Sequence, residues 1–246
     1  STTAIYDATG NTASTTQSNN TVTLFDEAGP TITATTIAPD NSTLTVTFSE
    51  PVFNANGGNG DLELSDFSLS TNGGTATAVA TSISISGNVY TIGLTLTGTP
   101  TGTEVLTIVP SSATAIYDTI GNTASTTQSN NTVTLFDETA PTITATTIGQ
   151  NNSTVTVTFS EPVFNATGGS GALEVSDFSL SINGGSVTAV AASGISNIDN
   201  HDTLVLTLTR LLTGTDLLTI VPSPTSAIYD VDGTAAATSE PNNTIS

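Results

Sequence analysis

The groups in this chain that could do chemistry are almost all carboxylates. The sequence holds 21 Asp and Glu residues against a single basic residue, Arg210, with one His and no Cys. Without Cys there are no disulfides and no thiolate chemistry, and zinc sites rarely form from a single His. Without Lys there are no Lys–Asn isopeptide crosslinks. A bound divalent cation is therefore the main crosslink open to this chain.

Catalysis by these groups is not expected. A Ser-His-Asp triad would need His201, which lies in the Asn- and Asp-rich stretch NIDNHDT and is interpreted as a surface turn residue. A glycosidase needs only two carboxylates, but the chain has no Trp to offer a sugar platform. The Gly-rich stretches 57–60 and 168–171 do not open a helix, so they are interpreted as loop turns rather than phosphate loops. We predict that the chain is not an enzyme.

The charge of the chain limits its partners. A formal net charge of −20 repels nucleic acid and anionic membrane surfaces and attracts cations. Solubility in salt explains the same acidity equally well. No apolar run is long enough to cross a membrane. We expect no nucleic-acid partner and no direct membrane insertion.

Near-identical repeats organise the sequence. Residues 1–27 recur at 112–138 with three differences, and the segment VTFSEPVFNA at Val46 recurs at Val157, an offset of about 111 residues. A third, degenerate copy of the first motif begins at Ser226 as SAIYDVDGTAAATSEPNNTIS. The chain thus holds two repeat bodies and three copies of a closing segment. We predict a closing segment at 1–26, then repeats at 27–136 and 137–246.

Each repeat has the pattern of an all-β domain. Residues 43–48 alternate apolar residues with Thr, as do residues 90–96 apart from Gly93, and short strands of this kind are separated by Gly-rich turns. About seven short strands in about 100 residues predict tandem Ig-like β-sandwich domains. The recurring aromatics Phe25, Phe48, Phe53, Phe67 and Tyr117, with their copies, are predicted to be core residues.

The motifs VTFSEPVF, SDFSLS and AIYDxxGN resemble those of bacterial Ig-like domains in S-layer proteins and large surface adhesins. The resemblance covers both bodies, whereas the last copy departs from it with YDVDGT. It implies spacers in long extracellular or cell-surface arrays, and several related domains bind calcium at their junctions.

Sandwich topology predicts that acidic segments converge at the start of each body. The turn after the strand 43–48, the turn before the last strand and the entering linker would all lie at the same pole. These segments carry Asp26, Glu27, Glu50, Asp118 and Asn122 in the first body. The equivalent residues in the second are Asp137, Glu138, Glu161, Asp230 and Asp232.

Converging carboxylates with no basic residue beside them favour a cation, and Ca²⁺ prefers 6–8 oxygen ligands from flexible loops. Calcium is therefore the predicted cofactor. In the alternative without metal, Glu50 caps a turn and Asp118 makes an Asx-turn.

The first closing segment, 1–26, has no body before it. Two strands alone are marginal in water, so it should pair with something. It could complete a preceding domain of a longer polypeptide, or donate a strand to a neighbouring copy. The count of segments favours the first, because each body already has its own closing copy. The degenerate terminal copy keeps the second open.

The predicted function is a structural repeat of an extracellular surface protein, a stalk or a filament, whose partners are copies of itself or adjacent domains. The alternative is an adhesive or carbohydrate-binding module, for which residues 197–203 are the best candidate loop.

Overall fold

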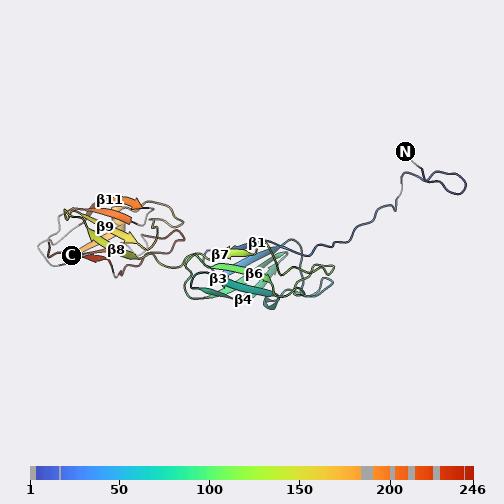
Figure 1. Cartoon of the computed structure of the whole chain (residues 1–246), viewed down its shortest axis with the longest axis horizontal. Coiled ribbons are helices and arrows are strands. Elements are labelled where there is room, and N and C mark those ends of the chain that lie inside the picture. Colours follow the sequence, from blue (N-terminus) through green and yellow to red (C-terminus); the bar gives the residue numbers. More distant parts are fainter. Residues whose placement is uncertain are drawn as a thin grey trace.

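The computed structural model describes residues 4–16, 18–183, 191–199, 203–209, 214–223, 228–240 and 242–246. His201 and part of the candidate adhesive loop lie outside these residues. We call residues 27–136 the first body and residues 137–246 the second body. Figure 1 shows the two bodies in line, with the N-terminal segment extending from the first body on the side away from the second.

The described residues form strands with two single 3-10 turns. In the first body the strands are β1 (Ile32–Ile37), β2 (Thr43–Phe48), β3 (Phe67–Asn72), β4 (Thr77–Ser86), β5 (Val89–Thr97), β6 (Val105–Pro110) and β7 (Thr132–Thr134), with a 3-10 turn η1 at Leu64–Asp66. In the second they are β8 (Ile143–Ile148), β9 (Thr154–Phe159), β10 (Phe178–Asn183), β11 (Ala192–Asp199), β12 (Thr203–Leu208), β13 (Leu217–Pro222) and β14 (Thr244–Ile245), with η2 at Val175–Asp177. No helix in the described part of the chain is long and apolar enough to span a membrane.

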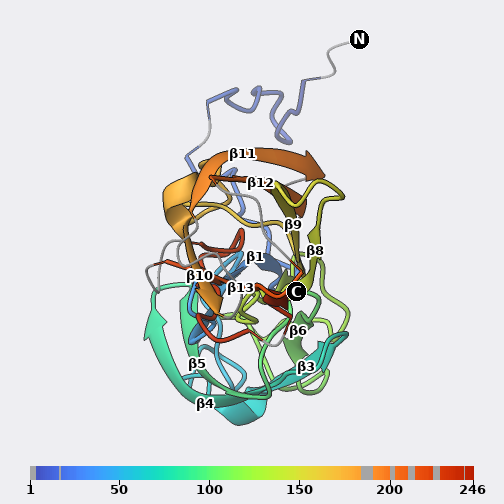
Figure 2. The ribbon, with the colours of Figure 1, turned by 90° about the vertical axis from the view of Figure 1, so that its left-hand side faces the viewer.

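The described strands of each body form two antiparallel sheets. In the first body the orders are β1-β2-β5-β4 and β3-β6-β7, and in the second β8-β9-β12-β11 and β10-β13-β14. This is the 4 + 3 arrangement of a constant-type Ig sandwich. The all-β, sandwich-like fold predicted from the alternation is therefore confirmed. In Figure 2, which looks along the long axis, the equivalent edge strands β4 and β11 lie on opposite sides.

The core of each body comes from the inward-facing residues of its sheets. On β2, Leu44, Val46 and Phe48 are buried while the intervening Thr residues are partly exposed. Tyr90 on β5 packs edge-on against Phe48 with ring centroids 5.6 Å apart, and its hydroxyl donates to the carbonyl of Val52 at 3.1 Å. The second body repeats this pattern around Val155, Val157 and Phe159, and its buried residues form a separate cluster.

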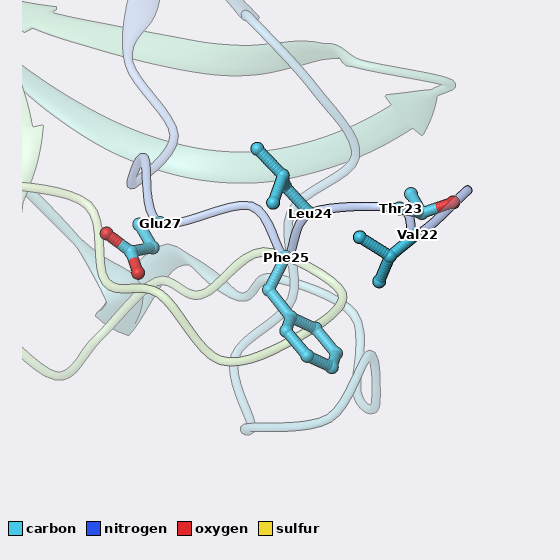
Figure 3. A pocket seen from close by; sticks show the side chains of 5 residues that line it. All are labelled: Val22, Thr23, Leu24, Phe25 and Glu27. Carbon is cyan, nitrogen blue, oxygen red and sulfur yellow. The ribbon is translucent and has the colours of Figure 1, made fainter. Parts of the chain in front are cut away.

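The aromatic prediction is wrong for the N-terminal copy. Phe48 is buried and Phe67 is half-buried, as expected, but Phe25 is 89% exposed and Tyr6 is 62% exposed. Figure 3 shows Leu24 and Phe25 projecting to opposite sides of an extended chain, where with Val22, Thr23 and Glu27 they line a shallow open pocket. These side chains are exposed because residues 4–26 do not close a sandwich here.

Candidate cation sites at the start of each body

A tight turn positions Asp118, the innermost carboxylate of the first site. Asp118 is 1% exposed, and its Oδ1 accepts hydrogen bonds from the N–H groups of Ile120, Gly121 and Asn122 at 2.9, 2.6 and 2.8 Å. The Asn122 side chain donates to Oδ2 at 2.7 Å. Gly121 has φ of 104°, a left-handed conformation that favours glycine. The D-x-x-G-N motif thus holds the Asp118 carboxylate in one orientation.

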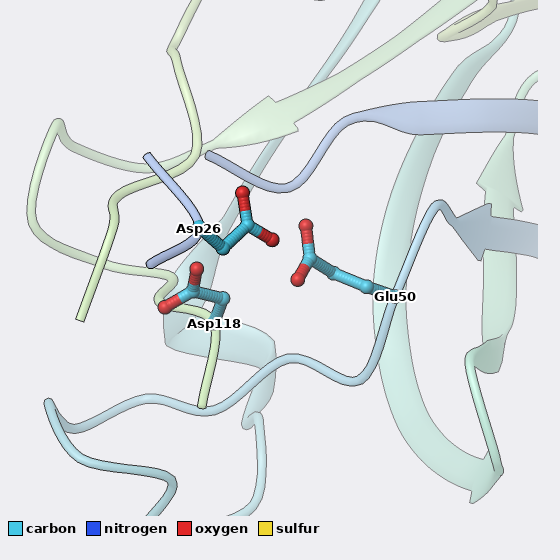
Figure 4. A group of neighbouring side chains, drawn as sticks. All are labelled: Asp26, Glu50 and Asp118. Atoms are coloured by element: carbon cyan, nitrogen blue, oxygen red, sulfur yellow. The ribbon is translucent and has the colours of Figure 1, made fainter. Parts of the chain in front are cut away.

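The end of β2 and the linker bring two more carboxylates to this turn. Glu50 follows β2, and the linker is fastened beside it because Ser49 N–H donates to Thr31 carbonyl at 2.8 Å. The Asn122 side chain also donates to the carbonyl of Asp26 at 3.1 Å. One carboxylate oxygen each from Asp26, Glu50 and Asp118 lies within 4.8 Å of the others, and Figure 4 shows the three groups facing one another.

This convergence changes the acidity of the carboxyls. Burial, then the charges of Asp118 and Asp26, raise the pKa of Glu50. Burial also opposes ionisation of Asp118, but the hydrogen bonds from Asn122, Gly121 and Ile120 outweigh it and lower the pKa of Asp118. The pair therefore combines one carboxylate held ionised with one that resists ionisation unless positive charge is nearby.

The second body has the same arrangement. Oxygens of Asp137, Glu161 and Asp230 lie within 4.8 Å of one another. Thr234 stands at the place of Asn122, and its hydroxyl donates to the carbonyl of Asp137 at 3.1 Å. Burial, followed by the charges of Asp137, Asp230 and Asp232, raises the pKa of Glu161 to about 7.

The second site also holds an unsatisfied buried oxygen. Asp230 is fully buried, and its Oδ1 accepts from the N–H groups of Gly233 and Thr234 at 2.5 and 2.6 Å. Its Oδ2 is buried without a hydrogen-bond partner, whereas the matching oxygen of Asp118 receives the Asn122 amide. A buried, unpaired carboxylate oxygen costs free energy, and a cation would relieve that cost.

Four predicted residues lie outside the two triads. Glu27 is exposed, and Asn122 faces Asp118 through its donor nitrogen. Glu138 instead accepts a hydrogen bond from the Asn41 side chain at 2.9 Å, on the first body. Asp232 is exposed and accepts the N–H of Asp137 at 2.8 Å, so it lies beside the second triad.

The structure also shows a junction contact that we did not predict. The carbonyl of Pro100 accepts from the N–H of Glu138 at 3.0 Å and from the hydroxyl of Thr139 at 3.1 Å. The loop before β6 therefore touches the linker into the second body. The TGT sequence of this loop predicts a turn but not this contact, because the contact depends on how the linker leaves the first body.

The two triads have the residue types that could hold a hard cation. Each offers oxygen ligands of negative charge, and no basic side chain of the described residues lies in either group. Ca²⁺ takes 6–8 oxygens, so carbonyls and water would have to complete each shell.

Comparison with known proteins gives only distant structural likenesses. No family model matches the sequence, and no curated protein matches it. The N-terminal part of the bacterial S-layer protein SbsC aligns with 82% of this chain at 18% identity and a TM-score of 0.34. InvD of Yersinia pseudotuberculosis aligns with 87% at 15% identity and a TM-score of 0.32. The chain spans 42% and 56% of the lengths of those two chains.

Proposed function

We propose that this chain is a non-enzymatic structural repeat of an extracellular surface protein, made rigid by calcium at the start of each body. The observation that carries the proposal is the recurrence of one three-carboxylate cluster at the same place in both bodies. A structural array needs each body held at a fixed angle to the next, and the second cluster lies at the linker between bodies.

The contacts of the second cluster support a role in holding that linker. Asp137 lies at the start of the second body, in the linker that enters from the first, whereas Glu161 and Asp230 lie within its sandwich, so a cation shared among them would tie the linker to the sandwich. The adjoining residues Glu138 and Thr139 are bonded to Pro100 of the first body. A cation at Asp137 would therefore reduce bending between the bodies.

The residues fit calcium in charge and ligand type. Asp26, Glu50 and Asp118, and likewise Asp137, Glu161 and Asp230, would bind through carboxylate oxygens, and the unpaired Oδ2 of Asp230 would gain a partner. The cation would supply charge neutralisation and crosslinking. We expect the cell surface as the location and copies of the chain or adjacent domains as partners.

The test is thermal unfolding with and without calcium. A ligand that binds only the folded state at 100 times its Kd stabilises by about 2.7 kcal/mol, which corresponds to about 10 °C in melting temperature for a domain of this size. We expect calcium to raise the melting temperature, EDTA to reverse this, and magnesium to act more weakly. Small-angle X-ray scattering should show a longer, stiffer particle with calcium.

Matched variants separate the two sites. Glu50→Gln should reduce the calcium effect on the first body and Glu161→Gln that on the second, while Glu63→Gln, at an exposed site outside both clusters, should change neither. An identical melting curve in calcium and in EDTA would overturn the calcium proposal.

A further inference from the structure

The N-terminal segment, residues 4–26, exposes apolar side chains whose counterparts in the first body are buried or half-buried. Val22, Leu24 and Phe25 are 84%, 85% and 89% exposed (Figure 3). In the first body the counterpart of Leu24 is Leu135, which is 2% exposed. The first body therefore shows which surface can bury a segment of this sequence. It is the core and the β6 edge of a repeat body.

The segment already has the turn that it would need when seated. Asp7 Oδ1 accepts from the N–H groups of Thr9 and Asn11 at 2.9 and 2.8 Å, and the Asn11 side chain donates to Oδ2 at 2.8 Å. These are the contacts that Asp118 makes with its own turn. A preformed turn reduces the ordering cost of binding.

The first body could accept this segment only by releasing its own closing segment, which fits equally well. Its closing strand β7 pairs with β6, and Gln128 accepts the N–H of Ile32 at 2.9 Å and donates to the carbonyl of Ser125 at 2.7 Å. No buried side-chain oxygen or nitrogen in residues 112–138 lacks a hydrogen-bond partner, and this sequence matches the N-terminal one.

The second body is closed by a copy that fits less well. Glu240 stands at the place of Gln128, and both of its carboxylate oxygens are buried without a hydrogen bond of normal geometry. Asp230 keeps one unpaired oxygen because Thr234 replaces the Asn of the other copies. At these two places the N-terminal segment carries Asn11 and, by sequence, Gln17, the residue types that the first body uses.

We propose that residues 4–26 of one copy replace residues 228–246 as the closing segment of the second body of another copy. This inference rests on the proposed structural function and names the partner, a second copy of this chain. The register follows from the first body, where Leu106 pairs with Val133, and from the second, where Leu218 pairs with Ile245. Val22 of the donor would lie opposite Leu218.

The junction between copies would then match the junction within a chain. The closing segment of the first body runs through Phe136-Asp137-Glu138 into the second body, and the donated segment runs through Phe25-Asp26-Glu27 into the donor's first body. Asp7 of the donor would stand at the place of Asp230, beside Asp137 and Glu161 of the acceptor. A head-to-tail contact of this kind builds an open filament when its rotation does not close a ring.

A disulfide trap tests the register. Thr219 Oγ1 lies 3.2 Å from Thr244 Oγ1, and Thr21 would take the place of Thr244. A Thr21→Cys chain and a differently tagged Thr219→Cys chain are refolded together from urea and mildly oxidised. The chain has no natural Cys, so any disulfide comes from the introduced pair. Each chain carries a single introduced Cys, so every disulfide must join two copies.

The control partner is Thr107→Cys, the equivalent position on β6 of the first body, which pairs with Thr132. We expect at least about tenfold more heterodimer with Thr219→Cys than with Thr107→Cys, a preference of about 1.4 kcal/mol. No heterodimer, or equal yields with both partners, overturns the proposal.

Two further variants test the cause of the preference. Glu240→Gln in the acceptor should lower the heterodimer yield several-fold because it improves the resident segment, and Val22→Asp in the donor should abolish it. An unchanged yield with Glu240→Gln also contradicts the proposal. Calcium-dependent melting is measured on the same chains. A normal calcium response without heterodimer would therefore overturn strand donation and leave the proposed function standing.

Discussion

The side chain of Asn41 is hydrogen bonded to the backbone of Phe136 through both of its polar ends. Its Nδ2 donates to the Phe136 carbonyl at 3.0 Å and its Oδ1 accepts the Phe136 N–H at 2.9 Å. Asn41 is 1% exposed and has φ of 53°, a left-handed conformation that Asn tolerates better than most residues. The turn between β1 and β2 therefore clamps the end of the closing segment.

Asn41→Asp should destabilise the first body. The substitution keeps the side-chain shape and Oδ1 but removes the donor to Phe136, and it places a second carboxylate beside Glu138. Loss of one buried hydrogen bond with an unsatisfied partner costs about 1–3 kcal/mol. Urea unfolding at neutral pH measures the loss, and Asn19→Asp, at an exposed site, is the control. Equal midpoints for Asn41→Asp and the unmodified chain would contradict the clamp.

The parts of this molecule that follow from local pattern were predictable. The alternation at 43–48 predicted β2 and its buried face, and sandwich connectivity then predicted that Glu50, Asp118 and the linker meet at one pole. The contacts that depend on another segment of the chain could not be predicted. The repeat pattern places Phe25 in the core, but Phe25 is exposed because no described part of this chain covers it. Glu138 contacts Asn41 because the β1–β2 turn is left-handed there, which no periodicity reveals.

Glu161→Gln should stabilise the metal-free second body near neutral pH. The folded-state pKa of Glu161 is about 7, above the ordinary value of 4.5, so ionisation is harder in the folded state. Stability from this group is fully present below pH 4.5 and is lost as pH rises to about 7. The Gln variant should lack this loss, and the difference in melting temperature from the unmodified chain should grow across that interval in EDTA.

Glu104 provides the contrast for that pH experiment. Hydrogen bonds from the N–H groups of Ala76, Thr101 and Thr75 outweigh the effect of its burial and lower its pKa to about 2. Its contribution is therefore present above pH 4.5 and is lost as pH falls toward 2. A Glu161→Gln effect confined to the acid side of pH 4.5 would contradict the assignment.

Glu240→Gln should stabilise the second body at neutral pH by about 1–3 kcal/mol, the usual cost of a buried unsatisfied group. Burial raises the pKa of Glu240, with a smaller opposing effect from the nearby N–H of Ile143. The amide would accept that N–H as Gln128 accepts the N–H of Ile32. Because the raised pKa lets the carboxyl become neutral at low pH, the gain should shrink as pH falls. A gain independent of pH would point to packing instead of charge.

Thr234→Asn should stabilise the metal-free second body and reduce its response to calcium. The new amide would donate to Oδ2 of Asp230 as Asn122 donates to Asp118, and a hydrogen bond to a charged group contributes about 1.5–3 kcal/mol. With that oxygen already satisfied, binding a cation relieves less unpaired charge. Melting temperatures in EDTA and in calcium measure both effects on one protein. If calcium shifts the melting temperature of the variant by as much as that of the unmodified chain, the unpaired oxygen of Asp230 is not a ligand.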